Sequence, residues 1–375
     1  MVKKIVVIPD SYKGCLTSKE VATIIGKTLN EIFPDAKIVQ IPVSDGGDGF
    51  VDSYLAAVGG EKITLKTKGP YMEEIDGFYG MIDEQTAIVE MAASAGLLLV
   101  KNKKNPCLTT TYGVGEIIKD AVARGAKKII LGLGGSATND MGVGMANSLG
   151  VLFVDQNNTT FLPVGETLGD ITDIFIDKVD PQILKTKFTT LCDVRNPLYG
   201  PNGAAFVYAK QKGASEIDII KLDESMKKLA DLLYKKFQFN ANFVGAGAAG
   251  GMTVSAKLFL NSEIKSGINT FLELIKFQNI IQNADMIITG EGRFDSQSMT
   301  GKVIDGISQY AQSAQIPLYA IVGQTENLQK ALIPKGLTKI IALTDYSQSI
   351  EDAITNAQVY LQKATFDLAS TLENK

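Results

Sequence analysis

The chain of 375 residues contains no histidine, no tryptophan and only three cysteines. The lack of histidine excludes a Ser-His-Asp triad, a histidine general base and a histidine-ligated zinc site. Acid–base or metal chemistry must therefore come from Asp, Glu, Lys, Tyr or Cys. Cys15, Cys107 and Cys192 are odd in number and far apart. They match neither a zinc spacing nor a disulfide framework, so we expect a cytoplasmic protein.

Long apolar runs and a strong excess of one charge are also missing. The apolar run that follows Lys3 and Lys4 ends at Pro9, which is too short for the core of a signal peptide. No apolar stretch approaches the roughly 20 residues that a membrane-spanning helix needs. The net charge of −4 is mild. We therefore expect neither a membrane nor a nucleic acid as partner. The length of 375 residues is compatible with two domains.

The known phosphate-binding strings are absent or lack their structural context. Gly26-Lys27-Thr28 has Val21 where a Walker A loop needs glycine, and Gly301-Lys302 is followed by Val303. The stretch Gly245–Gly251 reads as G-x-G-x-x-G, but Gln238–Val244 before it makes a poor buried strand. We therefore reject a dinucleotide site there. A loop that approaches an anion closely and a loop that serves packing both remain possible interpretations.

The stretch Lys127–Gly150 organises the middle of the chain. An apolar run, Ile129–Leu131, leads into Gly132, Gly134 and Gly135, and polar residues then precede apolar ones at helical spacing. This pattern predicts a buried strand, a glycine turn and a polar helix start. Backbone N–H groups and the helix dipole would then favour a phosphate at this point. An ordinary strand-to-helix connection explains the glycines equally well.

Both ends of the chain show the alternation of strands and helices that is typical of a parallel sheet. Thr17 and Glu20 form a capping-box pattern at the start of the first helix. The predicted strands are Lys4–Ile8, Lys37–Ile41, Asp285–Thr289, Pro317–Val322 and Lys339–Leu343, and the predicted helices include Phe50–Val58, Lys302–Ala314 and Ile350–Leu372.

The region between the ends has a different character. Short alternating runs at Lys62–Lys66, Gly77–Ile82 and Thr86–Glu90 predict strands of an antiparallel or mixed sheet. The predicted fold is α/β with two domains. Residues 1–60 and 284–375 form a Rossmann-like parallel-sheet domain, and residues 61–283 form an inserted mixed α/β domain. We expect the active site in the cleft between the two domains.

The loops carry the groups that phosphoryl transfer requires, namely backbone donors and a cation around phosphates, carboxylates for Mg²⁺ and an acceptor for a proton. The same inventory would suit binding of a small acid without chemistry, so composition alone leaves this choice open. The side chains concerned are Lys13, Asp45, Asp193, Glu291, Asp295 and Lys302.

Nine motifs in order resolve that choice. They are PDSYKG at 9–14, SDGGDG at 44–49, EMAASAGL at 90–97, TTYGVGE at 110–116, GLGGSATNDMGVGM at 132–145, CDVRNPLYGPNGA at 192–204, QKGA at 211–214, GAGAAGG at 245–251 and TGEGRFDSQSMTGK at 289–302. Together they resemble the type 1 glycerate kinase family over essentially the whole chain. The resemblance implies ATP-dependent phosphorylation of glycerate with Mg²⁺. Asp48, Met141 and Ser298 depart mildly from the family pattern.

Roles for individual residues combine this resemblance with residue chemistry. We expect Lys13, Asp193 and Asp295 to be catalytic, with Lys13 on the substrate carboxylate or a phosphoryl oxygen and Asp193 as the base that deprotonates glycerate. Glu291 and Asp295 are the predicted Mg²⁺ ligands. The predicted nucleotide-binding residues are Gly134, Gly135, Ser136, Ala137, Gly247, Gly250 and Lys302. The predicted substrate-binding residues are Asp10, Ser11, Asp45, Asp48, Arg195 and Asn196; Asp45 and Asp48 could equally bind the metal.

Three other functions compete with this hypothesis. The G-x-G-x-x-G string suggests a nicotinamide-dependent oxidoreductase of hydroxy acids, and the Asp- and Lys-lined loops permit a non-catalytic acid-binding module. The sequence Gly-Leu-Gly-Gly-Ser-Ala at residues 132–137 resembles kinases of the galactokinase or homoserine kinase type, but nothing else in the chain does. For the favoured hypothesis we expect D-glycerate as substrate, phosphorylation at the 2-hydroxyl rather than the 3-hydroxyl, and a monomer or small homo-oligomer.

Overall fold

The computed structural model of the protein describes residues 2–12, 14–43, 49–295, 303–326 and 334–373. Internal contacts divide the chain into two compact units. The first unit comprises Met1–Asp45, Ala56–Val58 and Ser266–Lys375, and the second comprises Gly46–Leu55 and Gly59–Lys265. No helix in the described ranges combines the length and the apolar character needed to cross a membrane.

A five-stranded parallel sheet forms the centre of the first unit, in the order β16-β14-β12-β1-β2. It confirms the prediction that the two ends of the chain build one parallel sheet, because β1 pairs directly with β12. Its strands are β1 (Lys4–Pro9), β2 (Lys37–Gln40), β12 (Met286–Gly290), β14 (Leu318–Val322) and β16 (Leu337–Ala342).

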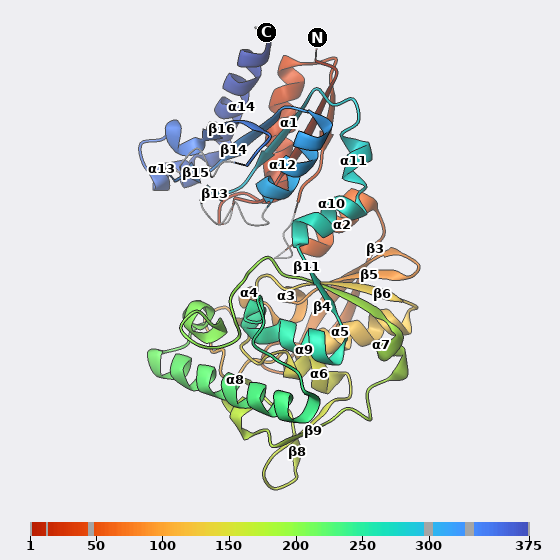
Figure 1. The fold of residues 1–375 in the computed structure, drawn as a ribbon. Helices are drawn as coiled ribbons and strands as arrows, with labels where there is room; N and C mark the ends of the chain where they lie inside the picture. Colours follow the sequence, from red (N-terminus) through yellow and green to blue (C-terminus); the bar gives the residue numbers. More distant parts are fainter. Residues whose placement is uncertain (1, 13, 44–48, 296–302, 327–333, 374–375) are drawn as a thin grey trace. The chain divides into compact units, whose positions relative to one another are not determined.

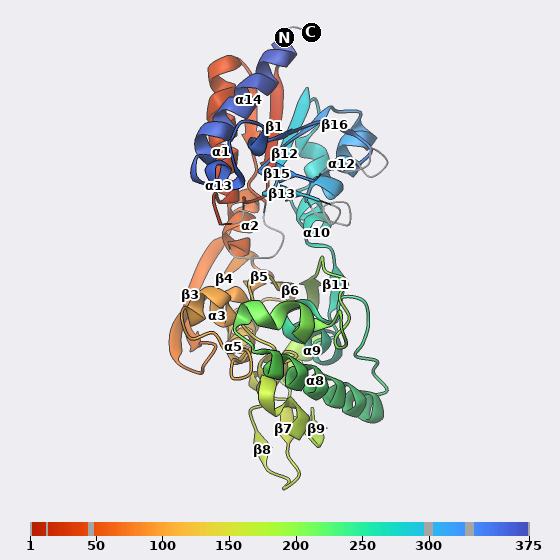
Figure 2. The same cartoon turned by 90° about the vertical axis from the view of Figure 1, so that its left-hand side faces the viewer.

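Helices cover both faces of this sheet (Figures 1 and 2). On one face, α1 (Ser18–Ile32) and α14 (Ala357–Glu373) pack buried leucines and isoleucines against β1 and β12. On the other face, Ile304 of α12 (Val303–Ala314) packs against β14. The remaining helices assigned to this unit are α10 (Gly267–Leu274), α11 (Phe277–Ile280) and α13 (Ile350–Thr355).

Local sequence signals explain where these helices begin and end. The capping box at α1 is confirmed, since Glu20 N donates to Thr17 Oγ1 at 3.2 Å and Thr17 N donates to Glu20 Oε2 at 2.8 Å. We expected one helix from Ile350 to Leu372, but the structure interrupts it at Asn356. There the Asn356 side chain donates to Asp352 Oδ1 at 2.7 Å, a local bond that competes with the helical pattern.

The second unit contains a six-stranded mixed sheet in the order β11-β10-β6-β5-β4-β3. Strands β3 and β4 pair antiparallel, as do β4 and β5, whereas β5, β6, β10 and β11 run parallel. The three strands predicted for the start of this region are therefore confirmed. The bounds are β3 (Glu61–Lys68), β4 (Glu74–Asp83), β5 (Thr86–Glu90), β6 (Lys128–Gly132), β10 (Lys187–Leu191) and β11 (Glu263–Lys265).

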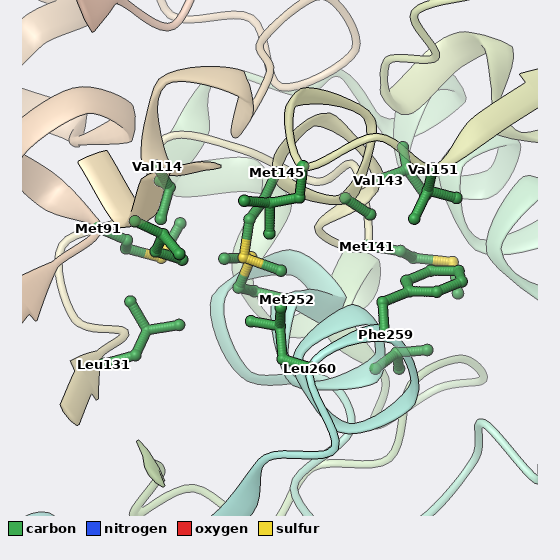
Figure 3. Close-up of a cluster of buried hydrophobic side chains, with 14 of the residues drawn as sticks. Met91, Val114, Leu131, Met141, Val143, Met145, Val151, Met252, Phe259 and Leu260 are labelled. Carbon is green, nitrogen blue, oxygen red and sulfur yellow. The ribbon is translucent and has the colours of Figure 1, made fainter. Parts of the chain in front are cut away.

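Among the described residues, the largest apolar cluster lies in this unit. Figure 3 shows Leu131 of β6 and Val114 of α5 (Tyr112–Ala123) gathered with Met145 of α6 (Val143–Ser148) and Met252 of α9 (Met252–Phe259). The other elements are α2 (Phe50–Val58, which the division into units cuts after Leu55), α3 (Ala92–Ala95), α4 (Leu97–Val100), α7 (Pro181–Lys185), α8 (Glu216–Phe237) and a small sheet of β7 (Leu152–Val154), β8 (Thr160–Phe161) and β9 (Asp173–Phe175).

The helices α5 and α6 approach each other closely because α6 carries glycine at position 144. A Cβ atom there would lie 2.1 Å from Thr110 Oγ1 and 2.8 Å from Thr111 N. Only glycine allows this approach, and the approach brings the start of α6 beside the start of α5. The loop between β6 and α6 is therefore held in a fixed position relative to the sheet.

Candidate active site

In the first unit, polar side chains meet where β1 and β12 end. Pro9 pairs with Gly290, and Asp10 N donates to Gly290 O at 2.8 Å. Asp10 and Glu291 are both buried. In an open α/β sheet, ligands bind outside the carboxyl ends of the strands where the strand order reverses. The position between β1 and β12 is such a point, since β2 lies on one side of β1 and the later strands lie on the other.

The segment after Glu291 is tied to the next strand connection. Gly323 N donates to Glu291 O at 3.0 Å, and β13 (Arg293–Phe294) pairs with β15 (Gln324–Thr325). Arg293 forms ion pairs with Asp295, at 3.5 Å, and with Glu326. The Asp295 side chain is 17% exposed. The structure thus brings Asp10, Ser11, Glu291 and Asp295 to the same edge, with Arg293 partly balancing the negative charge.

In the second unit, the glycine turn after β6 is held by the segment around α3. Leu97 N donates to Gly135 O at 2.7 Å, and Ala137 N donates to Ala95 O at 2.8 Å. Gly135 is exposed, while Ser136 and Ala137 are buried. The Ala137 amide is therefore already bonded within the protein, and the donors left at the tip of the loop are those of Gly134, Gly135 and Ser136.

The helix after this turn begins later than the sequence suggested, and its first donors bind an anion of the chain itself. Met141 and Gly142 have φ angles of 52° and 75°, so the helix cannot include them and α6 starts at Val143. Gly142 N and Gly144 N donate to the Asp140 carboxylate at 3.1 and 3.3 Å. Asp140 therefore takes up these two donors, and the expectation of a phosphate at this stretch stays a prediction that falls on the loop before the helix.

Asp140 also receives two hydrogen bonds from Thr111, one from its N and one from its Oγ1, both at 2.8 Å. The residue has no solvent exposure. Burial raises the pKa of the Asp140 carboxyl above its usual range, and the four hydrogen bonds act in the opposite direction. The carboxylate thereby joins the start of α5, the loop and the start of α6.

A lysine that the sequence analysis did not single out contacts the same loop. Lys212 is 2% exposed, and its Nζ donates to Ser136 Oγ at 2.9 Å and to Thr138 O at 2.7 Å. Burial lowers the pKa of Lys212 to about 7, and the nearby charge of Asp140 opposes this shift. The sequence contains the QKGA motif at 211–214, but the run Lys210-Gln211-Lys212 is typical of an exposed turn. Only the tertiary contacts show that one of its lysines points inward.

The second glycine string packs against both neighbouring loops. Gly247 N donates to Asn196 O at 3.0 Å, and Met141 N donates to Gly250 O at 3.0 Å. A Cβ atom on Gly250 would lie 2.1 Å from Thr138 O, and its φ of 68° also favours glycine. No strand precedes this string, in agreement with our rejection of a dinucleotide site. The structure shows close backbone packing here, and nucleotide binding by Gly247 and Gly250 stays a prediction.

Asp193 follows β10, the strand next to β6, so it lies at the same edge of the sheet as the glycine turn. It is partly exposed. Burial, and secondarily the charge of Asp193, raises the pKa of the fully buried Tyr54. At the end of β5, the buried Glu90 accepts a hydrogen bond from Val51 N at 2.9 Å. These contacts place two carboxylates at the carboxyl edge of the second sheet.

The other predicted residues lie as follows. Asn196 accepts a hydrogen bond from Tyr208 OH at 2.6 Å and donates to Asn202 O at 2.9 Å, while Arg195 is exposed. Four predicted site residues, Lys13, Asp45, Asp48 and Lys302, lie outside the described residues. Sequence reasoning missed the structural roles of Asp140 and Lys212, because both depend on burial of a charge by distant segments.

Together, the two sheets define an α/β protein with ligand-binding edges. In each unit, carboxylates and glycine-rich turns follow parallel strands at their carboxyl edge, which is where α/β proteins bind ligands. Both units show the same relation between strand direction and polar loops.

The comparisons with known proteins identify the family. Residues 5–373 match the model of the glycerate kinase family. A glycerate kinase of Bacillus cereus is 41% identical over 98% of this chain and 97% of its own length. A glycerate 2-kinase of Escherichia coli is 39% identical over 98% of each chain. The crystal structure of a candidate glycerate kinase 2 from Salmonella typhimurium LT2 has a TM-score of 0.84 at 34% identity and covers 100% of this chain and 99% of its own.

The chain therefore belongs to the glycerate kinase family, and it is an ATP-dependent phosphotransferase. The resemblance carried by the nine motifs is confirmed. The oxidoreductase and the acid-binding module lose their support, since the family is one of kinases and the G-x-G-x-x-G string lacks its strand.

Burial of Lys212 predicts a pH-dependent stability. An unfolded lysine titrates near pH 10.4, so between pH 7 and pH 10 the unfolded chain binds more protons than the folded one. The free energy of unfolding therefore rises with pH over this interval. The cost of burying a charged Lys212 is absent above about pH 10 and grows as the pH falls toward 7. Raising the pH from 7 to 9 should thus increase the stability of the wild type relative to Lys212→Met by about 2 kcal/mol.

Urea unfolding of both proteins at pH 7, 8 and 9 measures this difference. Lys210→Met is the matched control, because the Lys210 side chain is 76% exposed two residues away, and it should follow the wild type at every pH. Parallel curves for the wild type and Lys212→Met would contradict the expectation.

Proposed function

We propose that this protein transfers the γ-phosphoryl group of ATP to the 2-hydroxyl of D-glycerate, giving 2-phosphoglycerate and ADP. The observation that carries the proposal is the similarity along almost the full length of both chains to a protein named glycerate 2-kinase. The family match over residues 5–373 supports glycerate as the acceptor. The glycine turn after β6 supplies N–H donors for phosphate groups, and the carboxylates at both sheet edges suit a metal ion or a proton acceptor.

The nucleotide phosphates are assigned to the exposed tip of the loop after β6. Gly134, Gly135 and Ser136 offer backbone and hydroxyl donors there, and this loop is fixed from behind by Leu97, Ala95 and Lys212. Fixed donors stabilise charge on phosphoryl oxygens better than mobile ones, because no reorganisation is needed during the reaction. The other residues proposed near the phosphates are Ala137, Gly247, Gly250, Lys302 and the catalytic Lys13, of which Ala137 and Gly247 already use their amide donors within the protein.

Asp193 is proposed as the general base. It lies at the same sheet edge as the phosphate loop and is partly exposed, so a hydroxyl group of a small acid can reach it. A carboxylate that accepts the hydroxyl proton as the bond to phosphorus forms is the usual arrangement in kinases. The proposed contacts for the rest of glycerate are Asp10, Ser11, Asp45, Asp48, Arg195 and Asn196.

Glu291 and Asp295 are proposed to hold Mg²⁺. Carboxylate oxygens suit this ion, which is usually bound by one or two carboxylates together with substrate phosphates and water. Among the described residues, no group of three or more acidic, histidine or cysteine side chains could hold a metal by itself. This finding fits an ion shared with the nucleotide. When bound, Mg²⁺ would neutralise charge on the phosphoryl oxygens.

Incubation of the purified protein with Mg-ATP and D-glycerate tests the proposed reaction. ADP release should depend on D-glycerate, and phosphorus NMR should identify 2-phosphoglycerate as the product. Formation of 3-phosphoglycerate would refute the proposed regiochemistry. Absence of glycerate-dependent ADP release would refute the glycerate kinase activity itself.

Replacing Asp193 tests the base. Asp193→Asn keeps the shape of the side chain but cannot accept the proton, so kcat should fall by about 10²- to 10⁴-fold. The KM for ATP should change by less than about twofold, because the base does not contact the nucleotide in this scheme. Asp231→Asn, at an exposed position of α8 in the same unit, is the control and should keep the wild-type rate. Near-normal turnover of Asp193→Asn would rule this base out.

Replacing the proposed metal ligands tests the Mg²⁺ assignment. Asp295→Asn or Glu291→Gln should raise the Mg²⁺ concentration for half-maximal activity about tenfold, equivalent to about 1.4 kcal/mol of binding energy. Glu351→Gln removes an exposed carboxylate from α13 in the same unit and should leave the Mg²⁺ dependence unchanged. Unchanged Mg²⁺ titrations for both site variants would place the metal elsewhere.

A further inference from the structure

Lys212 lies on a turn that directs one lysine inward and another outward. A π-helical turn, Ala205–Ala209, continues into the 3₁₀ turn Lys210–Lys212, which ends at Gly213 with a φ of 99°. The Lys210 side chain is 76% exposed, whereas Lys212 is only 2% exposed. Lysine is almost never fully buried without partners, so the interior position of Lys212 needs an explanation.

The partners of Lys212 all belong to the loop between β6 and α6. Its Nζ contacts Ser136 Oγ and Thr138 O, which are 76 and 74 residues away in the sequence. The next charged group along this loop is Asp140, which is fully buried and opposes the desolvation of the ammonium group. Lys212 therefore connects a distant turn to the loop that carries the exposed Gly135.

The bond to Ser136 fixes the direction of the serine hydroxyl. In the bond between the two side chains, Lys212 Nζ donates to Ser136 Oγ, and when Lys212 is protonated its ammonium group has three donors and no acceptor, so this direction is fixed. The serine's own hydrogen is then left to donate, and among the described residues Ser136 Oγ donates no hydrogen bond. A phosphate oxygen at the tip of the loop would be an acceptor for it.

The loop is also held from its other side. Gly135 O accepts from Leu97 N, and Ala137 N donates to Ala95 O, so the two residues flanking Ser136 are bonded to the segment around α3. Backbone bonds on one side and the lysine on the other leave Ser136 little freedom. Such a support keeps a donor in place before the substrate arrives.

We propose that Lys212 is a positioning residue for phosphoryl transfer, which holds the loop after β6 and directs the Ser136 hydroxyl hydrogen to a phosphate oxygen of the bound nucleotide. This inference rests on the proposed function, because it assigns the nucleotide phosphates to that loop. It adds a residue that acts through Ser136 rather than by touching the reacting atoms.

A double-mutant cycle tests the proposal. Lys212→Met, Ser136→Ala, the double variant and the control Lys210→Met are compared with the wild type in steady-state kinetics with ATP and D-glycerate. Each single site variant should raise the KM for ATP about tenfold, with the KM for glycerate within about twofold of normal. The double variant should resemble the more severe single variant, since both changes remove the same donor. Lys210→Met should match the wild type.

The alternative is a purely structural lysine. In that case Lys212→Met would lower the thermal midpoint and the fraction of active enzyme but leave the KM for ATP normal. In the double variant, the fold-changes of the two single variants in the KM for ATP would multiply. A normal KM for ATP in Lys212→Met, or fold-changes that multiply in the double variant, would each overturn the proposal. Should Lys212→Met fail to fold, Ser136→Ala alone decides, because it keeps the lysine; an unchanged KM for ATP would overturn the assignment of the hydroxyl.

The same proteins separate this inference from the proposed function. Isothermal titration with Mg-ADP measures nucleotide binding without glycerate. If the wild type binds Mg-ADP but does not phosphorylate glycerate, the proposed substrate is wrong, and a tenfold weaker affinity of Lys212→Met and Ser136→Ala still supports the role of Lys212. If the wild type phosphorylates glycerate and both variants bind Mg-ADP normally, the proposed function stands and the role of Lys212 is refuted.

Discussion

The buried carboxylate of Asp140 is the interaction on which the second unit's loop geometry depends. It collects hydrogen bonds from Thr111, Gly142 and Gly144, and it opposes the desolvation of Lys212. A buried charge is costly unless it is hydrogen-bonded and balanced, so these contacts support one another. The exposed Gly135 keeps its place because Lys212 holds Ser136 and Thr138 behind it, together with the backbone bonds from the segment around α3.

Local patterns predicted most of the fold. Alternation and apolar runs located β1, β3, β4 and β12, and the Thr17 capping box located α1, because these signals depend on residues close in the sequence. The late start of α6 could not be predicted in this way. It depends on left-handed backbone at Met141 and Gly142 and on an acceptor supplied by Asp140, and these features arise only when α5, α6 and the loop before α9 come together.

The candidate site shows the same limit more sharply. Motifs located Glu291, Asp193 and the glycine turn at the carboxyl edges of their sheets. They could not distinguish glycines that face a ligand from glycines that allow close packing, and Gly250 is packed against Thr138 O. Nor could they show that Lys212 is buried while Lys210 is exposed, since burial of one lysine in a short polar run is decided by segments more than 70 residues away.

The pairing of β1 with β12 has a consequence for biosynthesis. These neighbouring strands are joined only after about 280 intervening residues, as the pair Ile5 and Met286 shows. During translation, β1 and β2 leave the ribosome long before β12, β14 and β16. Until β12 emerges, the edge of β1 that pairs with it has no partner strand. The second unit is complete once Lys265 has emerged and can fold in that interval. Nascent chains paused at that length would therefore expose an unpaired strand edge to chaperones or to aggregation.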